Sequence, residues 1–364
     1  MVNNHLFVFP TAILGGAERV MFNIIYHLLL EKQDVTVVIM SRGKQSGWEK
    51  LESFPNLNLI IYNYSSEKKK AIIPLVVRLV RLSFAYKFNY IFSSHTHING
   101  LLSFLKKICF FRGSVLVSRE STFIFDRFFG VKRFIFKFIY KYLYGQQDLI
   151  ICQTKKMKDS LENSLGYIPA KKMEVISNPV NIDYINSSIS TVIKENIIVG
   201  CGRFIPLKKF DFLLQAFAQL TSKYDCYKLV LIGDGPEGER LRTMAEDLGV
   251  SKKVIFTGKI NNPIQWFANA KIGVISSEIE GFPNVLIEMM ASGINCAIST
   301  PCTDGVYQLP NVIVTADCSI VEIGKALEEV LESQLNYSVD YKKYIEQERS
   351  VSYFWNQVLE LTKS

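Results

Sequence analysis

The sequence predicts an α/β protein with two domains, each a doubly wound parallel β-sheet, that face each other across a cleft. Short apolar runs alternate with amphipathic stretches along the chain, which is typical of parallel sheets covered by helices on both faces. The chain has 364 residues, 48% of them hydrophobic, enough for two cores of ordinary size. The turn-rich segment SNPVNID at 177–183 suits a hinge. We therefore expect an N-terminal domain at 1–180 and a C-terminal domain at 181–344.

The expected strands form two series of apolar runs. The first series is LFVF (6–9), DVTVVIM (34–40), YIFSS (90–94), SVLVS (114–118), LIICQ (149–153) and MEVIS (173–177). The second series is IIVGCG (197–202), YKLVLIG (227–233), KVIFTG (253–258), KIGVIS (271–276) and NCAIS (295–299). Because parallel sheets bind ligands at the carboxyl ends of their strands, we expect functional residues in the loops after these runs.

The cysteines and the apolar stretches predict a cytoplasmic protein. The seven cysteines are scattered and lack C-x-x-C spacing, which is typical of reduced thiols and predicts no metal site. The N-terminal apolar run is short and follows Asn-Asn-His, so we expect no signal peptide. The longest uncharged stretches fall short of a membrane span.

Charge divides unevenly between the two halves. Residues 1–180 carry 25 Lys and Arg against 12 Asp and Glu, a net charge of +13, whereas the remaining residues carry 17 against 22, a net charge of −5. The first half is therefore a basic module. Binding to nucleic acid is disfavoured, because no recognition motif is present and the second half is acidic.

The densest basic segment is 131–144, VKRFIFKFIYKYLY, where Arg133, Lys137 and Lys141 recur every four residues among six aromatic side chains. On a helix this pattern is a cationic stripe flanked by aromatics. One interpretation is an interfacial helix that binds an anionic membrane surface. The other is a domain helix whose aromatics belong to the core and whose lysines are solvated.

Two acids flank a predicted strand-to-helix turn in the segment EGFPNVLIE. Glu280 follows the apolar run KIGVIS, and Glu288 lies eight residues on, in the next helix. Pro283 suits the first helical position, and the free amides of a helix start favour a phosphate. Glu288, one turn after Asn284, can accept hydrogen bonds from a diol such as that of ribose. The alternative is that both acids are solvated surface residues.

Two cations, Arg203 and Lys208, lie five residues apart in the loop after IIVGCG. Arginine offers a planar fork of donors and lysine a mobile point charge, so together they can neutralise a diphosphate as it leaves. The alternative is a pair of surface cations before a helix.

Gly15 and Gly16, in LFVFPTAILGGAERV, lie where a strand ends and a helix begins. Glycine there allows the backbone to approach a ligand closely. A simple loop with a helix cap is the alternative.

The segment LIGDGPEGERL contains G-x-G-x-x-G, at Gly233, Gly235 and Gly238, which is a mark of dinucleotide-binding folds. Acidic neighbours would crowd a pyrophosphate, however, and the next run, VIFTG, ends without the acid that binds a ribose. We therefore do not expect NAD to bind.

The ordered set GGAERV, GRFIPLKKFD, LVLIGDGPEGERL, VIFTGKI and the E-x7-E block resembles the retaining nucleotide-sugar glycosyltransferases of family 4, which have the GT-B fold of two Rossmann-like domains. The similarity covers most of the chain and is densest from 197 to 300. It extends to bacterial enzymes that build lipid-linked surface polysaccharides such as O-antigen or capsule. It implies a nucleoside-diphosphate sugar donor, with UDP favoured over GDP, and a polyprenyl-diphosphate-linked glycan acceptor. It also implies no cofactor and a location on the cytoplasmic face of the membrane.

The resemblance also implies roles for individual residues. Arg203 and Lys208 match the pair that holds the donor diphosphate, Glu288 the acid that binds the ribose, and Glu280 the acid that contacts the transferred sugar. Backbone contacts to the phosphates and the base match Phe282, Pro283, Asn284, Val285, Lys259 and Ile260. Gly15 and Gly16 match the loop that lines the crevice between donor and acceptor. Candidates on the acceptor side are His95, His97, Arg119 and Glu120, although a histidine at a strand end is more often structural.

The implied reaction is substitution at the anomeric carbon with retained configuration, through an oxocarbenium-like transition state and without a metal. The fold implies that the terminal helix at about 345–364, including Tyr353, Phe354 and Trp355, packs back on the first domain.

One loop departs from the family pattern. After NCAIST, relatives show an acid, Pro-x-Gly and then Glu, whereas this chain has Pro301 at the place of the acid and Gln308 at that of the Glu. This departure leaves the donor sugar undetermined. A nucleotide-binding scaffold without activity is the rival function.

Overall fold

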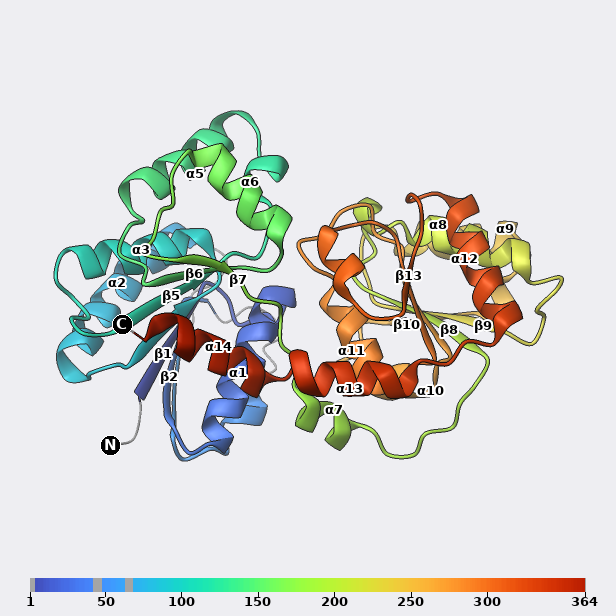
Figure 1. Ribbon diagram of the computed structural model, residues 1–364, viewed down its shortest axis with the longest axis horizontal. Coiled ribbons are helices and arrows are strands. Elements are labelled where there is room, and N and C mark those ends of the chain that lie inside the picture. Colours follow the sequence, from blue (N-terminus) through green and yellow to red (C-terminus); the bar gives the residue numbers. More distant parts are fainter. Residues whose placement is uncertain (1–3, 42–47, 63–67, 364) are drawn as a thin grey trace. The chain divides into compact units, whose positions relative to one another are not determined.

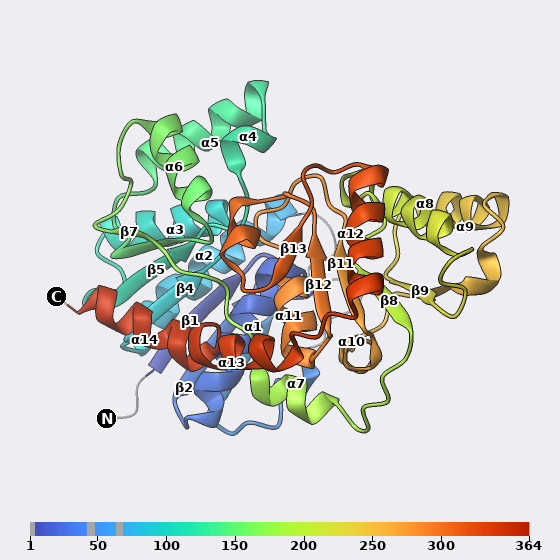
Figure 2. The ribbon, with the colours of Figure 1, turned by 45° about the vertical axis from the view of Figure 1, so that its right-hand side comes forward.

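The computed structural model describes residues 4–41, 48–62 and 68–363. It divides into two compact units, each with its own sheet (Figures 1 and 2). Unit 1 comprises Met1–Pro179 and Val351–Ser364, and unit 2 comprises Val180–Ser350. All strand pairs in both sheets are parallel in the described chain, so the predicted α/β class is confirmed.

Unit 1 contains a seven-stranded sheet in the order β3-β2-β1-β4-β5-β6-β7. Its strands are β1 (Asn4–Phe9), β2 (Asp34–Ile39), β3 (Leu57–Ile61), β4 (Tyr90–Ser93), β5 (Val115–Arg119), β6 (Leu149–Cys152) and β7 (Met173–Val175). Its helices are α1 (Gly16–Leu30), α2 (Lys68–Ala85), α3 (Thr96–Lys107), α4 (Ile124–Arg127), α5 (Gly130–Tyr142), α6 (Lys155–Leu165) and α14 (Val351–Thr362), with a 3₁₀ turn, η1 (Glu49–Leu51).

Helices cover both faces of the unit 1 sheet because its strands alternate between two apolar clusters. On β1, Leu6 and Val8 pack with residues of α2 and α3, whereas Phe7 and Phe9 pack with residues of α1 and α14. The chain order of the strands reverses between β1 and β4, so the loops after these two strands flank the switch point where such sheets bind ligands.

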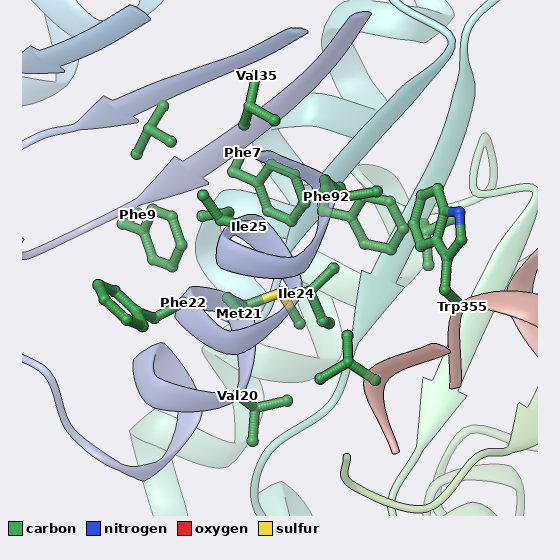
Figure 3. Close-up of a cluster of buried hydrophobic side chains, with 14 of the residues drawn as sticks. Phe7, Phe9, Val20, Met21, Phe22, Ile24, Ile25, Val35, Phe92 and Trp355 are labelled. Carbon is green, nitrogen blue, oxygen red and sulfur yellow. The ribbon is translucent and has the colours of Figure 1, made fainter. Parts of the chain in front are cut away.

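The terminal helix α14 belongs to unit 1. Phe354 and Trp355 are buried there, while Tyr353 is exposed. The ring of Trp355 lies 5.5 Å from that of Phe92, beside Phe7 (Figure 3). The preceding helix, α13 (Ser338–Glu348), is part of unit 2, so the returning segment begins at Val351 rather than near 345.

Unit 2 contains a six-stranded sheet in the order β10-β9-β8-β11-β12-β13, with its switch point between β8 and β11. Its strands are β8 (Ile197–Cys201), β9 (Lys228–Ile232), β10 (Val254–Gly258), β11 (Ile272–Ile275), β12 (Cys296–Ser299) and β13 (Val312–Val314). Its remaining helices are α7 (Ile182–Ser188), α8 (Phe210–Leu220), α9 (Gly238–Asp247), α10 (Ile264–Asn269), α11 (Asn284–Ser292) and α12 (Ile320–Ser333), with 3₁₀ turns η2 (Pro206–Lys208), η3 (Ser251–Lys253) and η4 (Asp304–Gln308).

Two apolar clusters again enclose this sheet. Residues of α8, α9 and α12 form the cluster on one face, and residues of α7, α10, α11 and α13 form the cluster on the other. Helix α11 therefore starts beside the switch point, directly after the loop that follows β11.

Strands β3 and β13 were not predicted from the sequence. Both are edge strands, and their residues are mostly only partly buried. An edge strand pairs on one side only, so its apolar run need not be long. The three residues of β13, VIV, are too few for a clear pattern.

Candidate functional site

Arg203 and Lys208 lie in the loop after β8, at the switch point of unit 2. Phe204 is buried and anchors this loop, because its amide donates to the carbonyl of Asp234 at 3.0 Å. Arg203 itself is exposed. Lys208 ends η2, and the next residue, Lys209, has φ +48°, a left-handed conformation that only a constrained loop holds for a non-glycine residue.

Hydrogen bonds join this loop to the one after β11. The hydroxyl of Ser276 donates to the carbonyl of Lys208 at 2.7 Å, and the amide of Glu278 donates to the carbonyl of Leu207 at 2.9 Å. The side chains of Lys209 and Glu278 form an ion pair at 3.1 Å. The two loops that flank the switch point are therefore one connected structure.

At their junction Lys208 and Glu280 form an ion pair. The ammonium of Lys208 donates to Oε1 of Glu280 at 2.6 Å, and the hydroxyl of Ser277 donates to the same oxygen, also at 2.6 Å. The side chains are 24% and 13% exposed, so the pair is only partly desolvated and its groups remain within reach of a ligand. A lysine ammonium has three donors, and Oε2 of Glu280 is a further acceptor. The pair can bind a phosphate oxygen and a sugar hydroxyl at neighbouring positions.

Helix α11 starts directly after this pair. Asn284 is its first residue, and Pro283, which we expected inside the helix, lies one position before it. Pro283 has no amide hydrogen, and the amide of Asn284 donates to the carbonyl of Phe282 at 3.0 Å. Of the backbone amides at 282–285 that we expected to bind a phosphate, those of Phe282 and Val285 are therefore left as donors.

No acid occupies the first turn of α11, so the positive end of the helix dipole can accept an anion. Glu288 lies one turn further and is half-buried. The helix ends at Ser292 and is capped by Gly293, with φ +88°.

Lys259 and Ile260 follow β10 in the same unit. Lys259 is exposed, and Ile260 packs against the apolar cluster that includes α11. Gly258 before them has φ +68°, and its carbonyl accepts from the amide of Gly233 at 3.0 Å.

The first two glycines of G-x-G-x-x-G have a structural role. A Cβ on Gly233 would lie 1.9 Å from the carbonyl oxygen of Gly202, and one on Gly235 would lie 2.4 Å from that of Phe204. The loop after β9 therefore packs directly on the backbone of the Arg203 loop. Glycine is required here by contact between two loops, without any dinucleotide.

The loop that departs from the family pattern, residues 300–308, contacts the same site. The amide of Glu280 donates to the carbonyl of Cys302 at 3.0 Å, and the hydroxyl of Thr303 donates to the carbonyl of Gly281 at 3.3 Å. Pro301 is half-buried and Gln308 is exposed at the end of η4.

Unit 1 presents a different arrangement at its switch point. Gly15 precedes α1, and a Cβ there would lie 2.9 Å from Oε2 of Glu18. The other oxygen of Glu18, Oε1, lies 3.1 Å from Nε2 of His95, just before α3. Glu18 is buried, whereas His95 is half-buried and His97 is exposed. Gly16 opens α1 beside this pair.

Arg119 and Glu120, expected on the acceptor side, are buried and bound within unit 1. The guanidinium of Arg119 donates to Oδ1 of Asn178 at 2.5 Å. Glu120 accepts from the hydroxyl of Tyr144 at 2.8 Å and from that of Thr96 at 3.2 Å. Burial lowers the pKa of Arg119 to about 10 and raises the pKa of Glu120. These two residues organise the domain, which argues against direct contact with a ligand.

Ser277 and Glu18 were not predicted as site residues from the sequence. Ser277 follows β11 as the second of two serines, and Glu18 lies within GGAERV, three residues after the first glycine. A polar residue directly after an apolar run is a signal that could have identified Ser277.

Within the described ranges 4–41, 48–62 and 68–363, no three His, Cys, Asp or Glu side chains form a group that could hold a metal ion. No helix in these ranges is long and apolar enough to cross a membrane.

Comparison with known proteins matches both units to sequence families. Residues 14–184 match the model of "Glycosyltransferase Family 4", and residues 185–348 match that of "Glycosyl transferases group 1". The chain is similar to N-acetylgalactosamine-N,N'-diacetylbacillosaminyl-diphospho-undecaprenol 4-alpha-N-acetylgalactosaminyltransferase of Campylobacter jejuni, at 31% identity over 46% of this chain and 44% of that protein. It is also similar to the lipopolysaccharide core biosynthesis glycosyltransferase LpsE of Rhizobium meliloti, at 32% identity over 40% and 42%. The chain thus spans less than half the length of these relatives.

Solved structures share the fold over the full chain. The complex of Anabaena HepE with UDP-glucose superposes with a TM-score of 0.78 at 18% identity and covers 98% of both chains. The lipopolysaccharide outer core galactosyltransferase WaaB has a TM-score of 0.70 at 20% identity, again over 98% of both. Such neighbours are GT-B glycosyltransferases, and the predicted GT-B fold is thereby confirmed.

Proposed function

Because the chain belongs to glycosyltransferase family 4, we propose that it transfers a sugar from a nucleoside-diphosphate sugar to a lipid-linked glycan in bacterial surface-polysaccharide synthesis. The observation that carries this proposal is the Lys208–Glu280 ion pair beside the start of α11. It combines a cation for the leaving diphosphate, a carboxylate for the sugar and a helix start without its own acid. The undecaprenol-linked substrate in the name of the Campylobacter relative supports a lipid-linked acceptor.

In this proposal unit 2 binds the donor. Arg203, Lys208 and the amides of Phe282 and Val285 hold the diphosphate, while Glu288 accepts hydrogen bonds from the ribose hydroxyls. Lys259 and Ile260 lie beside the base. The complex of HepE with UDP-glucose supports UDP as the nucleotide, with GDP as the alternative.

The proposed reaction breaks the bond between the anomeric carbon and the diphosphate oxygen, which leaves with the bonding electron pair. Lys208 and Arg203 stabilise the charge that develops on that oxygen, which is the interaction that contributes most to such catalysis. The oxygen of the acceptor hydroxyl forms its new bond on the same face of the sugar and gives its proton to the departing diphosphate oxygen, so that configuration is retained. Glu280 holds Lys208 and accepts from the sugar. We propose that no resident metal takes part.

Unit 1 is the proposed acceptor domain. Gly15 and Gly16 allow the acceptor to approach the backbone, and His95 and His97 are the remaining side chains with exposed surface among the four expected there. Arg119 and Glu120 support these groups from inside the domain.

A thermal-shift series with UDP, GDP, ADP and NAD, without metal and then with magnesium, tests the donor class. A nucleotide at a hundred times its dissociation constant adds about 2.7 kcal/mol of stability. We expect one nucleoside diphosphate to raise Tm, and Glu288→Gln to weaken that shift. Stabilisation by NAD alone, or by none of the four, would refute the proposal. Nucleotide binding with no sugar transfer from any donor would favour the rival scaffold function.

We further propose that unit 1 binds the anionic cytoplasmic face of the membrane through α5. The only residue of α5 that is fully buried is Tyr140. Val131, Phe134 and Phe138 are 77%, 71% and 50% exposed. With Ile135 and Tyr142, which are also exposed, they recur at helical spacing on one face of α5.

Charge complements this apolar face. Lys137 and Lys141 are exposed beside it, whereas Arg133 is half-buried and donates to the carbonyl of Phe125 at 3.2 Å. Residues 68–118, which include α2 and α3 on the same face of the sheet, contain nine Lys and Arg and no Asp or Glu. Each basic residue near an anionic surface contributes about 1 kcal/mol to binding.

Sedimentation with vesicles tests this second proposal. We expect wild-type protein to sediment with vesicles that contain about a third anionic lipid and to stay in solution with neutral vesicles. Lys137→Glu with Lys141→Glu should release it, whereas Lys228→Glu with Lys252→Glu, at two exposed lysines of unit 2, should not. Equal sedimentation of both double variants would refute a role for α5.

A further inference from the structure

We propose that Arg349 is a positioning residue for the donor-phosphate loop, residues 276–283 between β11 and α11. It couples this loop to Val180 and Ser350, where the chain passes from one unit to the other. This inference rests on the proposed function of Phe282 and its neighbours. Arg349 follows α13, far from the motifs that carry the family resemblance. It is only 3% exposed, although it carries a guanidinium.

Two aromatic rings and one hydroxyl surround that guanidinium. Its central carbon lies 5.3 Å from the ring centroid of Phe282 and 5.5 Å from that of Tyr344. Nε donates to the hydroxyl of Tyr344 at 2.8 Å, and Nη1 is buried without a hydrogen-bond partner. No carboxylate within the described chain forms a salt bridge with Arg349.

A buried cation without a counter-ion is costly, and an apolar side chain of similar size would fill the same space without that cost. What a guanidinium adds is attraction to the faces of the rings, which is strongest where water is excluded. The ring of Phe282 is therefore held in place from one side by a charge.

Phe282 is the second-last residue of the loop 276–283, which joins β11 to α11. Two residues before it is Glu280, which binds Lys208, and two residues after it is the first residue of the helix. The amide of Phe282 is one of the two donors left for a phosphate in this segment. Restricting the ring restricts the backbone that carries this donor, so Arg349 acts on the phosphate site through Phe282.

The backbone of Arg349 lies at the boundary between the units. Its carbonyl accepts from the amide of Val180 at 2.7 Å, and Val180 forms a parallel bridge with Ser350. Unit 2 begins at Val180 and ends at Ser350, so both chain crossings are joined here. Arg349 thus contacts the chain crossing through its main chain and the donor-phosphate loop through its side chain.

A double-mutant cycle tests the coupling. Arg349→Met keeps the volume but removes the charge, and Phe282→Leu removes the ring. We expect Arg349→Met to raise the dissociation constant of UDP and the KM for the donor about tenfold, with a smaller change in kcat. In the Phe282→Leu background the same change should have less than a threefold effect, because the partner ring is absent. Tyr344→Phe, which keeps both rings, is the matched control and should leave UDP binding within about twofold.

Lower Tm with unchanged UDP binding in Arg349→Met would overturn the inference and leave a purely structural residue. Equal losses of UDP binding in both backgrounds would overturn it too. If Arg349→Met does not fold, Arg349→Lys provides the test: hydrogen exchange at the amides of 281–286 should speed up relative to wild type, and unchanged exchange would refute the coupling. Failure of wild-type protein to bind any nucleoside diphosphate would instead refute the proposed function.

Discussion

The two sheets each present a helix start beside their switch point, but the group that faces it differs. In unit 1 the start of α1 is met by the protein's own carboxylate, because Glu18 folds back over Gly15 and pairs with His95. In unit 2 the first turn of α11 contains no acid, and Glu280, in the loop before the helix, is paired with Lys208. An anion can therefore bind at the second helix start, whereas the first is already neutralised. This difference supports our proposal that unit 2 binds the donor phosphates and that unit 1 binds the acceptor.

The charged residues that follow the strands at the two switch points differ in burial. Arg119 and Glu120 are fully buried and bound inside unit 1. Lys208 and Glu280 keep part of their surface exposed. The end of a strand indicates where a charged residue lies, but burial decides whether it can meet a ligand.

Replacing the cation at the unit 2 switch point should have the largest effect. We expect Lys208→Ala to lower kcat about 100-fold to 1000-fold, because the charge on the leaving diphosphate loses its partner. Single-turnover assays with purified protein measure this loss. Circular dichroism should show an intact fold, since the ion pair is only partly buried. Turnover near that of wild type would show that the cation belongs to the surface.

A buried histidine in the core of unit 1 should make the free energy of unfolding depend on pH, independently of the Lys208–Glu280 site. Burial lowers the pKa of His5 from 6.5 to about 4, although its hydrogen bond to Gln33 opposes this shift. The stabilising contribution of the neutral ring is complete above pH 6.5 and is lost as the pH falls towards 4. Between pH 7.5 and 5 this amounts to about 2 kcal/mol. Urea unfolding at both values measures it, and His5→Gln should flatten the difference. An equally steep loss in that variant would assign the effect to other groups.

A comparison of Glu120→Gln with Glu280→Gln distinguishes the buried acid of unit 1 from the partly exposed acid of unit 2. Burial raises the pKa of Glu120, so its contribution to stability is present at low pH and declines as the pH rises through the raised pKa. Glu120→Gln should remove this decline and leave kcat within about threefold, whereas Glu280→Gln should lower kcat and leave Tm unchanged. Thermal unfolding at several pH values and donor kinetics distinguish them. Loss of turnover in Glu120→Gln at full stability would place that acid in the reaction.

Six of the seven strands of unit 1 and five of the six strands of unit 2 were predicted from the sequence. The interior strands and the edge strands β7 and β10 form clear apolar runs and were found, whereas the edge strands β3 and β13 were missed. The ion pair of Lys208 with Glu280 joins residues that are 72 positions apart. It depends on the order of the strands in the sheet, which cannot be read from a local sequence pattern. The burial of Arg119 was equally hidden, because Asn178, which binds it, lies 59 residues away. Arg349 had no local signal at all, since its partner Phe282 is brought to it only by the packing of α13 against α11.

The smallest expected effect comes from the position that departs from the family pattern. Gln308 is exposed at the end of η4, and an exposed carboxylate is screened by water and salt. We therefore expect Gln308→Glu to change the donor KM by less than about threefold, although residues 302–303 of the same loop hold the backbone of Glu280 and Gly281. Kinetics at low and at physiological ionic strength measure the change. A large change that persists at high salt would mean that bound donor shields position 308 from water. The η4 loop would then join the donor site, and unit 2 would bind the sugar through three loops rather than two.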